Sequence, residues 1–308
     1  MDLPYLNSAA LHDLLDYPTA VAALESGYAG AFQVPPRLQM DAGAGRMWLM
    51  PAAADGALGT KLVTQFDGNG VRGIARIQGL YIYLNSETGE PLALLDGRAI
   101  TEIRTAAVSA LATRWLANAG PVTLALFGSG VQAGAHLAAM RALFDVRDPM
   151  VCGATPEKSQ AFAATHGCRA ASREECCEAS LICVCTTSRT PVLDGSRLRP
   201  GTHINAVGNS RPDSRELDSS TVVRARLAVD NREGALVEAG DLLLPIAQGE
   251  IDEHHIVAEL PEIVRGRIVR QSPADITLFK SVGFALGDLV LARMAYARLA
   301  YERRGSRS

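Results

Sequence analysis

The fold of this chain is decided by Phe127-Gly128-Ser129-Gly130-Val131-Gln132-Ala133-Gly134. This stretch contains the pattern G-x-G-x-x-A, which follows the apolar run Val122–Phe127 and opens a predicted helix. In that position Gly128 permits a tight turn, Gly130 lets a pyrophosphate approach the backbone, and Ala133 lets the helix pack closely on the strand. The N–H groups and the dipole at the start of the helix then hold the phosphates. The stretch therefore predicts a dinucleotide-binding unit of the Rossmann type. Its expected cofactor contacts are Gly128, Ser129, Gly130, Val131 and Gln132.

The residues after 106 alternate between strand-like and helical segments. Val122–Phe127 is wholly apolar, as expected of a parallel strand that is covered on both faces. The predicted strands are 122–127, 149–153, 181–186, 203–208 and 226–230, and the predicted helices are 102–118, 131–144 and 156–166. Strands separated by helices imply right-handed βαβ crossovers and a doubly wound parallel sheet.

The two ends of the chain have a different pattern. Pro18 opens one predicted helix over 18–32, and Pro35-Pro36 stops it. Short β-rich pieces then follow at 46–50, 58–63 and 79–84, with a hairpin turn at 85–89 before a return strand at 91–95. A last helix, 284–302, is expected to pack back on this first region. We therefore expect an α/β fold in which a Rossmann doubly wound sheet spans 107–283. A second, α+β domain would combine 1–106 with 284–308.

Composition and charge narrow the class of protein. The 308 residues carry a formal net charge of −3, so we expect neither nucleic acid nor an anionic membrane as a partner. The N-terminus lacks a secretion signal, and no apolar run reaches the roughly 18 residues of a membrane span, so we expect a cytoplasmic protein. The six cysteines contain no C-x-x-C pattern and the six histidines have no ligand spacing. We therefore expect no metal site.

The end of the second predicted strand bears on the choice of cofactor. An NAD-binding unit usually has an acidic residue there, which binds the ribose 2′-hydroxyl. This chain reads Val151-Cys152-Gly153-Ala154-Thr155-Pro156-Glu157-Lys158, with no acid ending the strand. We therefore favour NADP(H) over NAD(H), which stays open, and we expect Ala154, Thr155 and Lys158 to lie beside the ribose. A single lysine at the start of a helix can also be merely solvated.

Three basic residues lie in otherwise uncharged surroundings. Arg37 follows Pro35-Pro36, Lys61 lies inside a strand-like run, and Arg104 lies in an apolar helix. A charge within a core-forming element is normally paired or functional, because uncompensated burial is costly. A planar guanidinium also suits a bidentate grip on a carboxylate. Read without other information, each of the three is more often a surface or ion-pair residue.

Further stretches match one known family in order along the chain. They are Pro36-Arg37, Thr60-Lys61-Leu62-Val63, Asp96-Gly97, Ile103-Arg104-Thr105-Ala106-Ala107, the glycine stretch, His203-Ile204-Asn205-Ala206-Val207-Gly208, Arg215-Glu216-Leu217-Asp218 and Thr277-Leu278-Phe279-Lys280-Ser281-Val282-Gly283. The chain resembles the ornithine cyclodeaminase/μ-crystallin family over essentially its whole length. The resemblance implies a Rossmann domain and a substrate-binding, dimerising domain built from both chain ends, with the active site between them. It also implies a homodimer, and it makes Arg37, Lys61 and Arg104 the trio that binds the substrate's carboxylate.

The family contains several chemistries, and position 210 bears on the choice among them. Its cyclodeaminases have an aspartate in this loop, which engages the substrate's amino group. This chain has Ser210 at that position, and serine can neither take a proton at neutral pH nor balance an ammonium group. Asp213 could in principle substitute. The loop thus resembles that of the ketimine reductase branch, whose substrate arrives as an imine, and we expect no carboxylate in the site for a free amine.

Other candidate contacts are weaker. Gln78 could bind the substrate, and Thr105 could bind the cofactor, although helical threonines usually just pack. Thr186, Thr187 and Val207 follow parallel strands, where cofactor-contacting loops occur in this fold. Lys280 and Gly283 open the last predicted helix and match a family stretch near the nicotinamide.

We therefore predict an NAD(P)H-dependent enzyme of amino-acid metabolism that reduces a cyclic imino acid. The substrate would be Δ1-pyrroline-2-carboxylate or Δ1-piperideine-2-carboxylate. Lys61 would be catalytic, because burial beside two arginines should lower its pKa toward the range useful for proton transfer. The alternatives are an alanine or arginine dehydrogenase, an ornithine cyclodeaminase, and a non-catalytic μ-crystallin-like binding protein.

Overall fold

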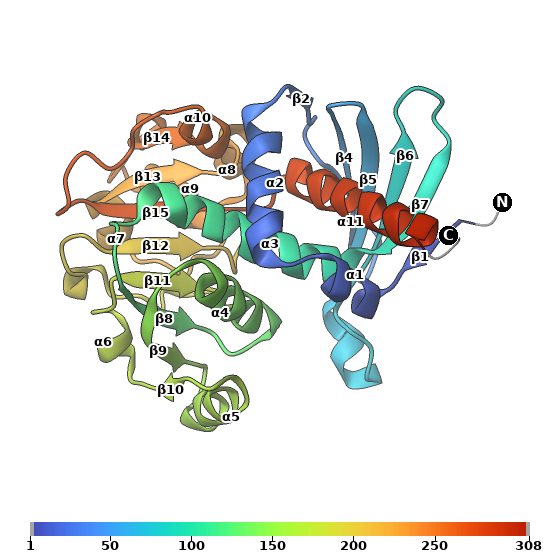
Figure 1. Ribbon diagram of the computed structural model, residues 1–308. Coiled ribbons are helices and arrows are strands. Elements are labelled where there is room, and N and C mark those ends of the chain that lie inside the picture. The colour runs from blue at the N-terminus through green and yellow to red at the C-terminus, as the bar shows by residue number, and fades with distance from the viewer. Residues whose placement is uncertain (1–2, 306–308) are drawn as a thin grey trace. The chain divides into compact units, whose positions relative to one another are not determined.

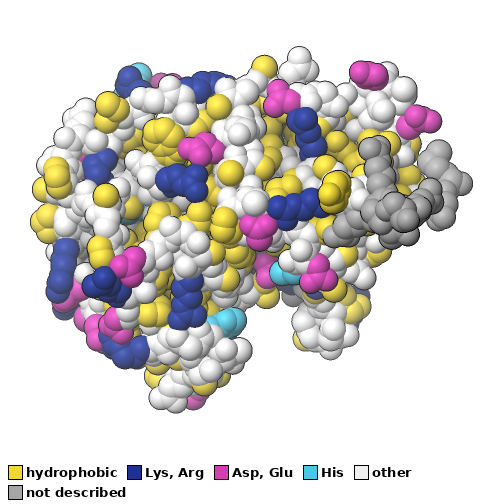
Figure 2. All heavy atoms as spheres, viewed as in Figure 1, with side chains coloured by type: hydrophobic (Ala, Val, Ile, Leu, Met, Phe, Trp, Pro, Cys, Tyr) yellow, Lys and Arg dark blue, Asp and Glu magenta, His cyan; other side chains and the backbone are white. Residues whose placement is uncertain are grey.

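The computed structural model describes residues 3–305 (Figure 1). The chain divides into two compact units. Unit 1 consists of Met1–Ala107 with Phe284–Ser308, and unit 2 consists of Val108–Gly283. Among the described residues, no helix is both long and apolar enough to span a membrane. On the face drawn in Figure 2, basic and acidic side chains are interspersed.

Unit 2 is built on an eight-stranded sheet with the order β10-β9-β8-β11-β12-β15-β13-β14, and its paired strands are parallel. The strands are β8 (Val122–Phe127), β9 (Val146–Cys152), β10 (Arg169–Ala170), β11 (Leu181–Val184), β12 (His203–Ala206), β13 (Ala225–Val229), β14 (Ile256–Glu259) and β15 (Ile276–Lys280). The chain runs outward from β8 to β10 and then crosses back to β11, so the sheet is doubly wound, as predicted. The direction of winding reverses between β8 and β11, where ligands bind in open α/β sheets.

The helices of unit 2 cover this sheet. They are α4 (Val131–Leu143), α5 (Pro156–His166), α6 (Arg173–Cys176), α7 (Ser219–Arg224), α8 (Arg232–Glu238), α9 (Gly240–Ala247) and α10 (Leu260–Val264), with 3-10 turns η2 (Gly195–Arg197) and η3 (Glu253–His255). Local signals fix the ends of α5: the Thr155 side chain accepts from Lys158 N, and Gly167 ends the helix with φ +62°. Both ends of α5 agree with the prediction.

Unit 1 contains a sheet with the order β1-β7-β6-β5-β4-β2, in which β3 also pairs with β4. Its strands are β1 (Tyr5–Leu6), β2 (Phe32–Gln33), β3 (Leu38–Asp41), β4 (Arg46–Ala54), β5 (Ala57–Gln65), β6 (Ile77–Asn85) and β7 (Pro91–Asp96). Its helices are α1 (Ser8–Leu14), α2 (Tyr17–Ala29) and α11 (Ala285–Gly305), with the 3-10 turn η1 (Asp67–Arg72), while α3 (Gly97–Leu116) runs from unit 1 into unit 2. The C-terminal helix α11 packs against α2 and against β4, β5 and β6, as expected (Figure 1).

Strand register gives the sheet of unit 1 two different faces. Met50, Lys61, Tyr81 and Leu95 lie opposite one another on adjacent strands, and all four are buried. The neighbouring row on the other face is Pro51, Thr60, Ile82 and Leu94, and these side chains are only partly buried. Side chains alternate between the faces of a strand, so Lys61 is directed to the buried side.

Four details of the sequence prediction were wrong. The helix predicted over 18–32 ends at Ala29 with Gly30 as its C-cap, and the next residues form β2. A separate helix, α1, precedes it, capped by Asn7. The predicted helix 102–118 begins at Gly97, because the Asp96 carboxylate accepts from the N–H groups of its first turn. Finally, Lys280 does not open the last helix, since it is the last residue of β15.

Candidate active site

A buried lysine and aspartate form the centre of a charged cluster in unit 1. Lys61 on β5 is 1% exposed, and Asp288 on α11 is fully buried. The Nζ of Lys61 donates to Asp288 Oδ1 at 2.9 Å, to Asp288 Oδ2 at 2.8 Å and to Thr101 Oγ1 at 3.1 Å. All three N–H groups of the ammonium are thus engaged inside the protein.

Arg104 shares the same carboxylate. It lies on α3, is 7% exposed, and donates from Nε to Asp288 Oδ1 at 3.1 Å. Its Nη atoms make no hydrogen bond to the residues that the structure describes. This leaves the two parallel N–H groups of its fork for a planar anion such as a carboxylate.

Arg37 completes the predicted trio. It is partly buried between β2 and β3, and its positive charge acts on Lys61. The pKa of Lys61 is lowered to about 8, chiefly by burial; Asp288 opposes this lowering, and the positive charges of Arg104 and Arg37 add to it. The structure therefore brings the three cations together, and the expected lowering of the Lys61 pKa is confirmed.

Asp288 was not predicted as a residue of the site. The signal was available, because Asp288 interrupts the apolar run Ala285-Leu286-Gly287-Asp288-Leu289-Val290, the same kind of pattern that drew attention to Arg104. Asp288 is bound to two cations, so the expectation that the site offers no carboxylate to a free amine stays a prediction.

Two further residues of unit 1 that were predicted to bind substrate or cofactor donate hydrogen bonds to backbone carbonyl groups rather than to the charged cluster. Gln78 is exposed near the start of β6 and donates to Ala75 O at 3.3 Å. Thr105 is buried on α3, and its hydroxyl donates to Thr101 O at 2.7 Å. The Thr105 hydroxyl is thus engaged within its own helix.

In unit 2 the glycine turn has the geometry that a dinucleotide requires. Gly128 has a φ of +104°, and a Cβ there would lie 2.6 Å from Cys185 O. Gly130 is the N-cap of α4, lacks a side-chain cap, and has open space where a Cβ would stand. Ala133 is buried against the sheet. Open space and an uncapped helix start fit a bound pyrophosphate. At the same turn Ser129 and Gln132 are partly buried and Val131 is exposed.

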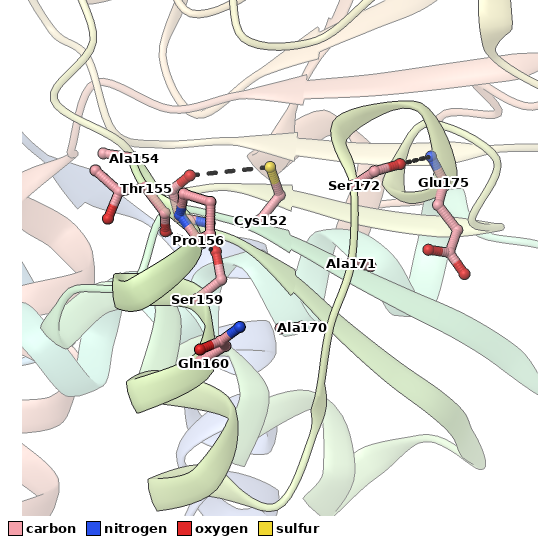
Figure 3. Close-up of a pocket in the computed structure, with 11 residues that line it drawn as sticks. Cys152, Ala154, Thr155, Pro156, Ser159, Gln160, Ala170, Ala171, Ser172 and Glu175 are labelled. Carbon is pink, nitrogen blue, oxygen red and sulfur yellow. Dashed lines mark hydrogen bonds between the residues drawn. The ribbon is translucent and has the colours of Figure 1, made fainter.

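A cavity of about 420 Å³ lies at the carboxyl end of β9 (Figure 3). It lies between the start of α5 and the segment before α6, and its lining includes Cys152, Gly153, Ala154, Thr155, Ser172 and Glu175. The end of the second strand is where a Rossmann unit holds the ribose, so the cavity fits an adenosine. Ala154 and Thr155 line this cavity, whereas Lys158 is exposed on the first turn of α5 and is not part of the lining. The ribose contacts of the three residues stay a prediction.

A second buried charged cluster ties together the loops at the carboxyl edge of the same sheet. Glu216, Asp241 and Lys280 are each fully buried. Glu216 Oε1 accepts from the N and Oγ1 of Thr186, both at 2.7 Å, and its Oε2 accepts from Asn209 N at 2.8 Å. Burial raises the pKa of Glu216. The carboxylate therefore joins the loop after β11 to the loop after β12.

Lys280 belongs to this cluster. Its Nζ lies 2.8 Å from Asp241 Oδ2 and donates to Asn209 O at 2.6 Å. Asp241 Oδ1 in turn accepts from Glu216 N and Leu217 N. We predicted Lys280 as a cofactor contact, but its ammonium is bound to protein groups, so it fixes the loop that carries Asn209. Glu216 and Asp241 were missed as site residues, although each acid stands next to apolar residues in the sequence.

The remaining predicted residues lie at the same edge of unit 2. Thr187 and Ser210 are exposed, and Val207 is partly buried. Gly283 has a φ of +92° and donates from its N to Asp230 Oδ2 at 2.7 Å. Asp213, the alternative acid of this loop, is exposed and bound to Arg189 at 2.6 Å. Among residues 3–305, no group of three or more His, Cys, Asp or Glu side chains could hold a metal ion.

A doubly wound sheet with an open glycine turn defines a nucleotide-binding α/β protein of the Rossmann class. The family model described as the ornithine cyclodeaminase/mu-crystallin family matches residues 8–303, and the chain belongs to that family.

Three known proteins illustrate the likeness. The chain is 38% identical to the ketimine reductase mu-crystallin of Rattus norvegicus, over 90% of this chain and 88% of that protein. It superposes with a TM-score of 0.92, at 34% identity and covering 97% and 98% of the two chains, on the Thermococcus litoralis Delta(1)-pyrroline-2-carboxylate reductase in complex with NADH and L-proline. An archaeal alanine dehydrogenase dimer with bound NAD gives a TM-score of 0.92 at 28% identity and 98% coverage of both chains.

Proposed function

We propose that this protein is an NAD(P)H-dependent oxidoreductase that reduces a cyclic imino acid to the cyclic amino acid. The substrates are Δ1-pyrroline-2-carboxylate and Δ1-piperideine-2-carboxylate. The observation that carries the proposal is the cluster in which Lys61 and Arg104 share Asp288 beside Arg37. It is supported by relatives whose names describe reduction of such imines.

The residues of the cluster have two different roles, binding of the substrate's carboxylate and donation of a proton. The fork of Arg104, with Arg37, holds the carboxylate of the substrate and fixes the orientation of its C=N bond. Lys61 is bound to the same carboxylate as Arg104, and its pKa of about 8 suits it to donate the proton that the imine nitrogen takes up. A bound dinucleotide, held by Gly128 and Gly130, supplies the hydride for the imine carbon.

Two alternative functions differ from the proposed one in the nitrogen compound that the enzyme must bind. An alanine or arginine dehydrogenase would need ammonium to make the amino acid from its keto acid, and a family structure named alanine dehydrogenase keeps this candidate open. An ornithine cyclodeaminase needs an acid for a free amine, whereas Ser210 occupies the predicted position and Asp213 is bound to Arg189. A non-catalytic binding protein would not need a lysine with a lowered pKa.

The experiment follows oxidation of NADPH and NADH at 340 nm with each cyclic imine, and with pyruvate plus ammonium. We expect oxidation with the cyclic imines without added ammonium. Oxidation only with pyruvate plus ammonium would identify the dehydrogenase instead, and conversion of ornithine to proline with ammonia release would identify the cyclodeaminase. No turnover with any of these, together with tight dinucleotide binding, would leave a binding protein.

The choice between the two dinucleotides depends on the cavity after β9. We propose NADP(H), as favoured from the sequence, with Lys158 as the cation for the 2′-phosphate. The choice is supported by the missing acid at the end of β9. Glu175 is the one charged residue in the lining of the cavity. The structures of two relatives contain NADH or NAD. The KM ratio of NADPH to NADH in wild type and Lys158→Ala tests it, and an unchanged ratio would contradict it.

We also propose that the protein forms a homodimer through unit 1, whose chain ends build the substrate-binding and dimerising domain. The partly buried sheet face has rows of apolar side chains, Leu49-Leu62-Leu80 beside Pro51-Thr60-Ile82-Leu94. An apolar sheet face of this extent is typical of an interface between subunits. The cytoplasmic location stays a prediction from the sequence.

A further inference from the structure

Lysine is rare in this protein, and one of its few lysines lies in the candidate active site. The chain has three lysines among its 30 basic residues, namely Lys61, Lys158 and Lys280. Arginine holds its charge at every physiological pH, whereas a lysine can lose its proton when it is buried. A lysine at position 61, with arginines at 37 and 104, is therefore suited to a step in which a proton leaves the side chain.

Burial by itself would remove the charge that Lys61 needs. The side chain is 1% exposed, and desolvation disfavours an ammonium. Arg104 and Arg37 repel it as well. Without an opposing group, Lys61 would be a neutral amine near pH 7, and such an amine can neither attract a carboxylate nor donate a proton.

Asp288 is the opposing group. Both of its carboxylate oxygens accept from Lys61 Nζ, at 2.9 and 2.8 Å. Among the described residues, the other groups that act on Lys61 are neutral or positive. Helix α3 contributes Arg104 and the hydroxyl of Thr101, and the segment before β3 contributes Arg37. Tyr81 lies opposite Lys61 on β6, and burial keeps its phenol protonated by raising its pKa.

We propose that Asp288 is a positioning residue that keeps Lys61 protonated and holds its ammonium beside Arg104, so that Lys61 can attract the carboxylate and, on giving up its hydrogen bond to Thr101, donate the proton. This inference rests on the proposed function. In the reaction the imine carbon receives a hydride from the reduced dinucleotide, which is oxidised. The imine nitrogen receives a proton from Lys61 Nζ, and the C=N double bond becomes a C–N single bond. Lys61 is left as a neutral amine and regains its proton from water.

The direct test is a ¹³C NMR titration of the protein labelled at lysine Cε. Three lysines give three signals, and Lys61→Met assigns the one of interest. We expect Lys61 to titrate near pH 8 in the wild type, and at least one pH unit lower in Asp288→Asn, which has nearly the same shape. The signal of Lys158, which is exposed, is the internal control and should not differ between the two proteins.

Kinetics test the consequence for catalysis. In Asp288→Asn we expect the alkaline limb of the kcat/KM profile to move to lower pH by the same amount, so that activity lost at pH 8 is partly regained at pH 6. Glu87→Gln, at an exposed hairpin position, should keep the wild-type profile. Lys61→Arg keeps the charge but cannot release a proton, so we expect KM to change little and kcat to fall at least 100-fold.

The outcomes separate this inference from the proposed function. A Lys61 titration or a pH profile that is the same in Asp288→Asn and wild type overturns the role of Asp288. Wild-type kcat in Lys61→Arg, which can be measured even if Asp288→Asn does not fold, overturns proton donation. Should the wild type fail to reduce cyclic imines while Asp288→Asn still shifts the Lys61 titration, the proposed function fails and the coupling of the two residues stands.

Discussion

Arg104 and Lys61 show how one buried carboxylate can organise two cations for different tasks. Asp288 occupies the Nε of Arg104 and all but one of the N–H groups of Lys61. The acid thus orients the arginine through one edge and leaves the other edge for an anion. Removing the arginine would leave a bound carboxylate without its charge-assisted hydrogen bonds, and such a loss is worth about 3 kcal/mol.

For Arg104→Met we therefore expect KM for the cyclic imine to rise roughly 100-fold, since about 1.4 kcal/mol corresponds to a factor of ten. The affinity for the dinucleotide should stay within twofold, because Arg104 acts on the substrate. The measurements are initial rates over imine concentration and dinucleotide binding by fluorescence. Arg98→Met, an exposed position on the same helix, is the control, and equal effects of the two substitutions would contradict the assignment.

At the scale of elements, Glu216, which lies in the long segment between β12 and α7, holds the loops after β11 and β12 together. Its carboxylate accepts from Thr186 and from Asn209. A Cβ on Gly208 would lie 2.1 Å from Thr186 O and 2.4 Å from Glu216 Oε1, so the two loops approach each other too closely for any other residue. The carboxyl edge of the sheet is thereby fixed before a ligand arrives.

In Glu216→Gln the amide group would turn an N–H toward a donor of one of these loops, which costs about 1–3 kcal/mol. We expect Kd for the dinucleotide to rise about tenfold, with a lower thermal midpoint. Fluorescence titration and calorimetry measure the two effects. Glu233→Gln, on the exposed side of α8 in the same unit, should change neither, and an unchanged Kd in Glu216→Gln would show that the loops do not need this carboxylate.

At the scale of the whole molecule, two buried histidines give unit 2 a pH-dependent stability. Burial lowers the pKa of His136 to about 4 and that of His203 to about 3, and the positive charge of Arg270 adds to the effect on His203. Unfolded histidine titrates near 6.5, so on acidification the unfolded state takes up protons before the folded state does. The two histidines therefore contribute stability that is present above about pH 6.5 and is lost below it, while Glu216, whose pKa is raised, acts in the opposite sense.

By pH 5 each of these histidines should have reduced the free energy of unfolding by about 2 kcal/mol. Urea unfolding between pH 8 and pH 5 measures this loss, and His136→Asn should flatten the curve. His254→Gln, which removes an exposed histidine, should leave the curve unchanged. A loss of stability between pH 7 and pH 5 that is the same in His136→Asn and in the wild type would contradict the prediction.

The proposed dimer makes a prediction at the same scale. Ile82 lies in the middle of the apolar row on the partly buried sheet face of unit 1. Burying an unpaired charge there would cost several kcal/mol, so we expect Ile82→Lys to be monomeric when the wild type is dimeric in sedimentation velocity experiments. Glu87→Lys should stay dimeric. A dimeric Ile82→Lys would place the interface elsewhere.

The sequence determined what depends on neighbouring residues. Val122–Phe127 and the glycines after it predicted β8 and the start of α4, because strand, turn and helix signals lie within a few residues of one another. The bounds of α5 were predicted as well. Arg37, Lys61 and Arg104 could be selected because each charge stands in an uncharged stretch.

Only the tertiary structure decided which charges meet. Asp288 is 227 positions from Lys61 and 184 from Arg104, and Lys280 is 71 positions from Asn209. Such pairs form because α11 packs on the sheet of unit 1 and because β15 pairs with β12. The spacing of residues along the sequence does not indicate either of these tertiary contacts. The sequence therefore marks the charged residues of this site, Asp288 included, as charges in uncharged stretches. That Asp288 holds two of the cations is decided only by the packing of distant elements.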